Sequence, residues 1–211
     1  MKTDDLIKAL AADTAAPTMT SLRVWLFAGV GALLIAATVF SIALGPRADI
    51  ATAAETLRFM LKPLESALLA ATAFATLIAL ARPDGDTRRL ATLAAAPVLL
   101  VIAVVVELAV LPPELWEARW IGSNSLLCLT YIPLIGIGPL AALMLAMRHG
   151  APTRPRLAGA VAGLMAGGVA AALYALHCPD DSPLFVATWY TIAIAALAAI
   201  GALVAPRVAR W

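Results

Sequence analysis

The sequence contains only two cysteines, Cys128 and Cys178, and they carry its most distinctive chemistry. A thiolate is a nucleophile and a ligand for soft metal ions, and two thiols that meet can oxidise to a disulfide. Beside Cys178 stand His177, Asp180 and Asp181, which could act as metal ligands or orient them. The spacing is not that of a zinc finger. Three interpretations stay open: a pair that reacts with oxidants or transiently binds a soft metal ion, a structural disulfide, or two unrelated thiols.

Sequence motifs of the common enzyme classes are missing. We find no Walker loop, nucleophile elbow, His-Glu-x-x-His motif or dinucleotide fingerprint. His149 and His177 are the only histidines, which excludes a multi-histidine metal centre. The formal net charge of +2 comes without clustered basic and aromatic residues, which argues against direct nucleic-acid binding. We therefore expect neither an enzyme nor a permanently bound cofactor.

The elements that must position these residues are membrane-spanning helices. Of the 211 residues 63% are hydrophobic and 13% charged, against roughly 45–50% and about 25% in soluble domains. A helix needs roughly 20 apolar residues to cross a bilayer, and six segments approach that length. They are about 24–44, 61–81, 90–111, 126–147, 157–176 and 184–205. The expected fold is all-α: a six-helix transmembrane bundle over residues 24–211 in the lipid bilayer, preceded by a cytoplasmic segment, residues 1–23.

The distribution of Lys and Arg predicts the orientation of the bundle. Eleven of them fall on the side of the two termini and four on the other. Short cytoplasmic loops retain positive charge, so both termini are expected in the cytoplasm of a bacterium, with the chain in the inner membrane. This places both cysteines on the outward, oxidising side. Aromatic residues near the outward span ends fit an interfacial belt: Trp116, Trp120, Tyr174 and Trp189.

Three ionisable residues, Lys62, Glu65 and Glu107, lie inside or beside the predicted spans. Such residues are costly in a membrane and are functional candidates by default. All three fall in the outward half, where a simple pairing of Lys62 with Glu65 or Glu107 is an equally good interpretation. The inner half of the spans offers no ionisable residue to continue a proton relay, which argues against a pump.

The fifth predicted span carries glycines at every fourth position, Gly159, Gly163 and Gly167. A helix face without side chains lets a neighbouring helix approach closely. We favour packing inside the bundle over a contact between two copies, and the oligomeric state stays open.

The segment before the first span predicts a short amphipathic helix over about residues 3–13. Acidic residues suit the positive end of a helix dipole, and apolar residues follow at helical spacing. So short a helix is unstable alone. It either rests on the membrane surface or docks into a cytoplasmic partner. The candidate partner-binding residues are Asp4, Asp5, Leu6, Ile7 and Leu10.

Two motifs resemble one known family. The chain opens Met-Lys-Thr-Asp-Asp-Leu-Ile, and residues 177–185 read His-Cys-Pro-Asp-Asp-Ser-Pro-Leu-Phe, followed by Trp189 and Tyr190. Both are similar to motifs of NrsF-type membrane anti-sigma factors. The resemblance implies a negative regulator that holds an extracytoplasmic-function sigma factor at the membrane. It also implies that Cys128 and Cys178 are stress-sensing positions, responding to oxidants or heavy metals. The alternatives are a small carrier or efflux protein and a membrane assembly factor without signalling.

Overall fold

The computed structural model describes residues 3–4, 7, 21–82, 85 and 87–209, which form helices and no strands. Six helical segments are long and apolar enough to cross a membrane, as the sequence predicted. They are α2 (Ser21–Ala43), α4 (Leu57–Leu80), η1 with α5 (Thr87–Ala94, Ala95–Val110), α7 (Ser125–Met147), α8 (Pro155–Ala175), and α9, η3 and α10 in succession (Pro183–Phe185, Val186–Tyr190, Thr191–Val208). The all-α bundle is confirmed.

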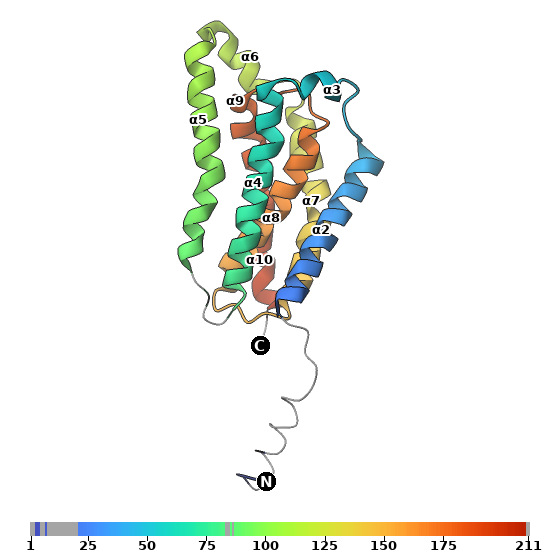
Figure 1. The fold of residues 1–211 in the computed structure, drawn as a ribbon, viewed down its shortest axis with the longest axis vertical. Coiled ribbons are helices and arrows are strands. Elements are labelled where there is room, and N and C mark those ends of the chain that lie inside the picture. Colours follow the sequence, from blue (N-terminus) through green and yellow to red (C-terminus); the bar gives the residue numbers. More distant parts are fainter. Residues whose placement is uncertain (1–2, 5–6, 8–20, 83–84, 86, 210–211) are drawn as a thin grey trace.

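The first span begins and the last span ends at the same end of the bundle (Figure 1). We call this the basic end. The opposite end carries three short helices, α3 (Ile50–Ala53), η2 (Pro113–Leu115) and α6 (Trp116–Ile121). Cys128 lies in the first turn of α7 and Cys178 follows the last turn of α8, both at this opposite end. We call it the cysteine end.

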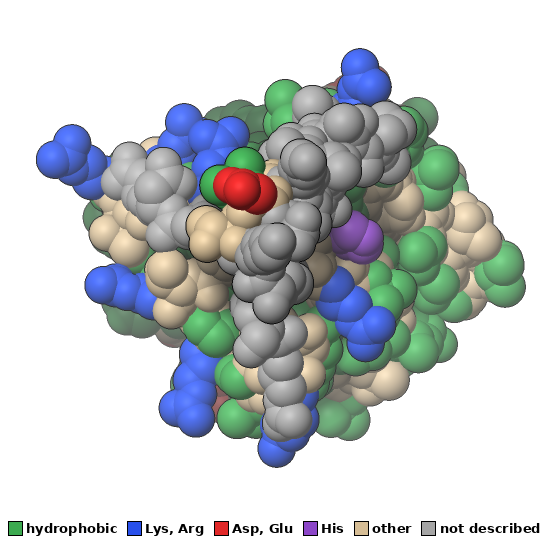
Figure 2. Space-filling model, turned by 90° about the horizontal axis from the view of Figure 1, so that it is seen from below, with side chains coloured by type: hydrophobic (Ala, Val, Ile, Leu, Met, Phe, Trp, Pro, Cys, Tyr) green, Lys and Arg blue, Asp and Glu red, His purple; other side chains and the backbone are tan. Residues whose placement is uncertain are grey.

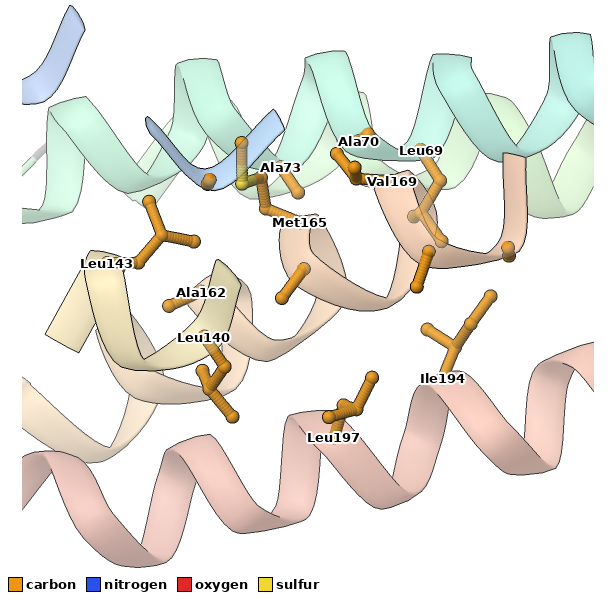
Figure 3. Close-up of a cluster of buried hydrophobic side chains, with 14 of the residues drawn as sticks. Leu69, Ala70, Ala73, Leu140, Leu143, Ala162, Met165, Val169, Ile194 and Leu197 are labelled. Atoms are coloured by element: carbon orange, nitrogen blue, oxygen red, sulfur yellow. The ribbon is translucent and has the colours of Figure 1, made fainter. Parts of the chain in front are cut away.

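Helix α8 lies at the centre of the bundle, surrounded by α4, α7 and α10 (Figure 3). Its sequence explains this position, because glycine and alanine make it thin enough for close approach. A Cβ atom on Gly159 or Gly163 would collide with the backbone of α10, at Gly201 and Leu197 respectively. The predicted glycine face therefore packs against a helix of the same chain.

The aromatic residues predicted to form an interfacial belt differ in their exposure. Trp116 and Trp120 in α6 are exposed, and the Trp189 indole donates to the Trp120 carbonyl oxygen (3.0 Å). Tyr174, however, is fully buried. It occupies the side of α8 that faces the other helices, so its position near a span end did not place it at the interface.

Candidate functional site

Both cysteines have free, fully buried thiols. Each sits at the end of a helix in the hairpin formed by α7 and α8, whose other ends are joined by residues 148–154. Asn124, one turn before Cys128, is hydrogen-bonded through its backbone N–H to the carboxylate of Asp180 in the loop that carries Cys178 (2.9 Å). The structure thus brings the predicted pair to one place at the cysteine end. Bridging of the two sulfurs by a disulfide or a metal stays a prediction.

The surroundings of Cys178 keep its thiol protonated. Burial raises the pKa of Cys178 because a thiolate is poorly solvated there. Two buried tyrosines lie nearby: the Cys178 N–H donates to the Tyr174 carbonyl oxygen (3.0 Å), and the ring centroids of Tyr174 and Tyr190 are 5.8 Å apart. Among the described residues neither tyrosine hydroxyl has a hydrogen-bond partner. The cysteine end therefore holds a compact group of buried polar side chains with unused hydrogen-bonding capacity.

A buried lysine holds the loop that carries Cys178, residues 176–182. The Lys62 ammonium donates to the Cys178 carbonyl oxygen (2.7 Å), the Asp180 carbonyl oxygen (3.2 Å) and the Asp181 carboxylate (2.7 Å). Lys62 is only 3% exposed, so it exchanges solvation by water for these three acceptors. The expected pairing of Lys62 with Glu65 or Glu107 was wrong, because the loop brings an acid from the far end of the sequence.

A second cation reinforces the same loop. Arg47, in the connection after α2, donates to the Asp181 carboxylate (3.0 Å) and pairs with Asp49 (2.7 Å). The hydrogen bond to Asp49 raises the pKa of Arg47, and in return Arg47 holds the pKa of Asp49 below its usual value. Asp181 therefore lies between two cations from different parts of the chain.

Asp180 ties the Cys178 loop to the start of the helix that carries Cys128. Its carboxylate accepts hydrogen bonds from the backbone N–H groups of Ser123 (3.1 Å) and Asn124 (2.9 Å), and from the Asn124 side chain (3.0 Å). Asn124 directly precedes α7, so the acid also lies at the positive end of that helix dipole. Movement of either cysteine-bearing segment must disturb these bonds.

The predicted metal-binding side chains point to separate partners. His177 Nδ1 lies 2.9 Å from the carbonyl oxygen of Gly45, whereas Asp180 and Asp181 are used as just described. Over the described part of the chain, no three His, Cys, Asp or Glu side chains are grouped as metal ligands. Binding of a transient soft metal ion would need some of these contacts to open, and it stays a prediction.

The two remaining acids within the candidate spans, Glu107 and Glu65, differ in their contacts. Glu107 is buried and accepts hydrogen bonds from the Ser182 hydroxyl (2.7 Å) and the Leu184 N–H (3.3 Å), with Arg58 3.6 Å away. Glu107 thus fastens α5 to the end of the Cys178 loop. Glu65 is partly buried and has no hydrogen bond or ion pair with a described residue.

The basic end offers exposed rather than buried charge. Its described arginines all have exposed side chains: Arg23, Arg82, Arg88, Arg89, Arg148, Arg154, Arg156 and Arg207. Figure 2 shows this face, with Lys and Arg side chains around its rim. Of the candidate partner-binding residues, Asp4 and Ile7 are helical and exposed. Asp5, Leu6 and Leu10 lie outside the described residues.

Several site residues were not identified from the sequence. Arg47, Ser123 and Asn124 bond to loop 176–182 from segments far away along the chain, and no local pattern marks them. Tyr190 did carry a signal, because a tyrosine in an apolar span brings a hydroxyl that needs a partner. The adjacent acids Asp180 and Asp181 in a short loop were also a sign that cations lie nearby, and Asp181 binds both Lys62 and Arg47.

Comparisons with known proteins show the family of the chain. Residues 10–211 match the family NrsF, described as negative regulator of sigma F. The chain is 36% identical over 216 residues to the anti-sigma-F factor NrsF of Caulobacter vibrioides. It is 33% identical over 213 residues to the probable anti-sigma-F factor NrsF of Azospira oryzae. Both alignments cover 100% of this chain and 100% of the relative. No solved structure matches the chain.

Proposed function

The chain belongs to the NrsF family of negative regulators of sigma F, and from this premise we propose how it retains and releases its partner. The partner is a sigma factor of the extracytoplasmic-function type, held at the bacterial inner membrane. Release follows when Cys128 and Cys178 meet an oxidant or a heavy-metal ion. The observation that carries the proposal is the joint burial of both free thiols at one end of the bundle.

Charge supports an orientation with the basic end in the cytoplasm. All described arginines of this end are exposed, whereas Lys62 and Arg47 at the cysteine end are bound to acids. Retention of positive charge in cytoplasmic loops then places the cysteine end outside. The partner would bind the N-terminal segment, where Ile7 is 57% exposed, together with the loop at residues 148–154.

The sensing step begins from a closed state. A buried, protonated thiol is a poor nucleophile and a poor metal ligand, so loop 176–182 must loosen before Cys178 reacts. Oxidation of the two thiols by diamide forms one S–S bond, and the two electrons and two thiol protons pass to the N=N bond of diamide, which becomes a hydrazine. A heavy-metal ion would instead displace those protons and bind both sulfurs.

The α7–α8 hairpin supports a route from the cysteines to the partner. Both thiols lie at its open end, and residues 148–154 close it at the basic end. The Ala151 N–H in this connection donates to the Ala81 carbonyl oxygen at the end of α4 (2.9 Å). A change in the distance between the open ends of α7 and α8 would shift this connection. The partner is released only if the bundle binds it with lower affinity after the change than before it.

The test uses the full chain co-expressed with an extracytoplasmic-function sigma factor from the same bacterium, and measures the fraction of sigma factor in the membrane pellet. We expect retention at rest, and release by diamide or mercuric ion. Cys128→Ser and Cys178→Ser should retain the sigma factor under both treatments. Met147→Leu is the matched control, because it removes a buried sulfur at the opposite end of α7 and should release normally.

The outcomes separate the two parts of the proposal. Release from the cysteine variants would overturn sensing by the thiols while leaving retention intact. If the sigma factor stays in the soluble fraction without treatment, the proposal that the chain binds this class of sigma factor is wrong. Ile7→Asp should abolish retention without lowering the amount of the chain in the membrane, and unchanged retention would exclude that residue from the docking surface.

A further inference from the structure

We propose that the groove between α4 and α5 binds a cationic amphiphile, a molecule with an aliphatic chain and a single amino group that pairs with Glu65. This ligand site is separate from the thiols and is not needed for retention of a sigma factor. The proposal rests on the shape of the groove, the chemistry of its walls and the absence of a partner for Glu65 among the described residues.

The groove contains two sizeable cavities. One of about 400 Å³ lies between α4, α5 and α10, and one of about 460 Å³ lies between α4 and α5 nearer the cysteine end. A narrow space of about 20 Å³ adjoins both and is lined by Lys62, Glu65 and Asp181. Each large cavity falls within the roughly 300–1,000 Å³ of small-molecule sites.

The walls select an aliphatic ligand. The cavity between α4, α5 and α10, called the lower cavity below, is lined mostly by apolar side chains, among them Leu69, Leu100 and Ile194. Helix α5, which forms one wall, exposes Val101 and Val105, so it lies at the periphery of the bundle (Figure 1). A chain of methylene groups can reach such a groove from the bilayer and fill it without leaving polar groups unpaired.

The charges of the groove select a cation. Lys62 already donates to three acceptors of loop 176–182, and Arg58 pairs with Glu107. Glu65 has no hydrogen bond or ion pair with any described residue. It faces the mostly apolar lower cavity on one side and the narrow space that Arg58, Lys62 and Asp181 also line on the other. An unpaired carboxylate is costly at such a position, and an ammonium group relieves that cost. A phosphate-bearing lipid would find the nearby cations already paired.

The wall opposite Glu65 contains an irregular turn that supports a binding role. Residues Val186–Tyr190 form the π-helical segment η3, and both Val186 and Tyr190 line the lower cavity. Single π-helical turns interrupt α-helices frequently at functional sites, because they widen the helix and turn side chains.

The proposal is tested with the full chain in phosphatidylcholine nanodiscs and a photoreactive probe. The probe is dodecylamine with a diazirine in its chain, and the reference is the same chain ending in a hydroxyl group. Mass spectrometry maps the labelled residues. We expect the amine to label groove residues such as Leu69 and Leu100 about tenfold more than the alcohol, equivalent to about 1.4 kcal/mol. Glu65→Gln should remove this preference, whereas Glu117→Gln, at an exposed acid of α6, should not.

Two results would overturn the proposal. Equal labelling by amine and alcohol would assign the groove to bilayer acyl chains. A preference that survives Glu65→Gln would exclude the carboxylate. If Glu65→Gln does not fold, Ala195→Leu narrows the lower cavity instead, and undiminished labelling in that variant would contradict the site. No sigma factor is present, so failure here does not bear on partner retention.

Discussion

At the cysteine end, two charged side chains, Lys62 and Glu107, are buried and bound to partners, whereas the described arginines of the basic end are all exposed. Lys62 is 3% exposed and holds three acceptors of one loop, while every described arginine at the other end faces outward. Opening the first arrangement costs free energy, because buried charges and carbonyls lose their partners. The second places positive charge on the surface of the basic end, where a partner or lipid headgroups can reach it. The difference fits a closed sensing end and an open docking end, and four predictions test it.

Replacing the central cation should have the largest effect. Lys62→Met keeps an apolar stem but removes the hydrogen bonds to two carbonyl oxygens and one of the two cations beside Asp181. We expect a loss of about 3 kcal/mol in the free energy of unfolding, measured by SDS titration of the purified chain. Arg119→Met removes an exposed cation at the same end and should change the free energy of unfolding by less than about 0.5 kcal/mol. Similar losses in the two variants would show that the buried Lys62 stabilises the fold no more than an exposed cation does.

Thiol reactivity should differ between the two ends. In Cys128→Ser the remaining Cys178 is buried and its pKa is raised, so little thiolate is accessible. A cysteine at the exposed Thr153, in a chain without the native cysteines, provides the comparison. We expect maleimide to label Cys178 about 30-fold more slowly, which corresponds to about 2 kcal/mol. Equal labelling rates would mean that loop 176–182 opens freely at rest.

The third test concerns the bond between the two cysteine-bearing segments. Asp180→Ala leaves the N–H groups of Ser123 and Asn124 without their acceptor, and we expect a loss of about 1–2 kcal/mol in the free energy of unfolding. Asp180→Asn keeps one acceptor oxygen and should lose less. Thr153→Ala, at the exposed connection of the basic end, should stay within about 0.5 kcal/mol. Should Asp180→Ala behave like Thr153→Ala, the carboxylate does not fasten these segments.

The fold could be predicted from the sequence to a greater degree than the site. Runs of apolar residues report membrane helices directly, and all six were found. The local spacing of Lys62 and Glu65 suggested a pair, but Asp181, 119 positions along the chain, takes the lysine instead. Tyr174 was assigned to the interface from its position along the span, although its side of the helix faces inward. Contacts between distant segments depend on how helices are rotated, which apolar runs with little periodicity do not reveal.

The smallest effect should come from acid. The pKa of Asp49 is lowered by Arg47, so the folded state favours the carboxylate form. The stability from this pair is therefore present at neutral pH and is lost as the pH falls through the lowered pKa. Because Asp49 is exposed, the contribution is small. Between pH 7 and pH 3, the melting temperature of Asp49→Asn in detergent should fall slightly less than that of the unaltered chain. Glu55→Gln is the matched control, since Glu55 is an exposed acid nearby without an ion pair among the described residues, and it should follow the unaltered chain. If Asp49→Asn loses as much stability in acid as Glu55→Gln, the Arg47 pair adds nothing measurable, and the closed state of the cysteine end depends on its buried contacts alone.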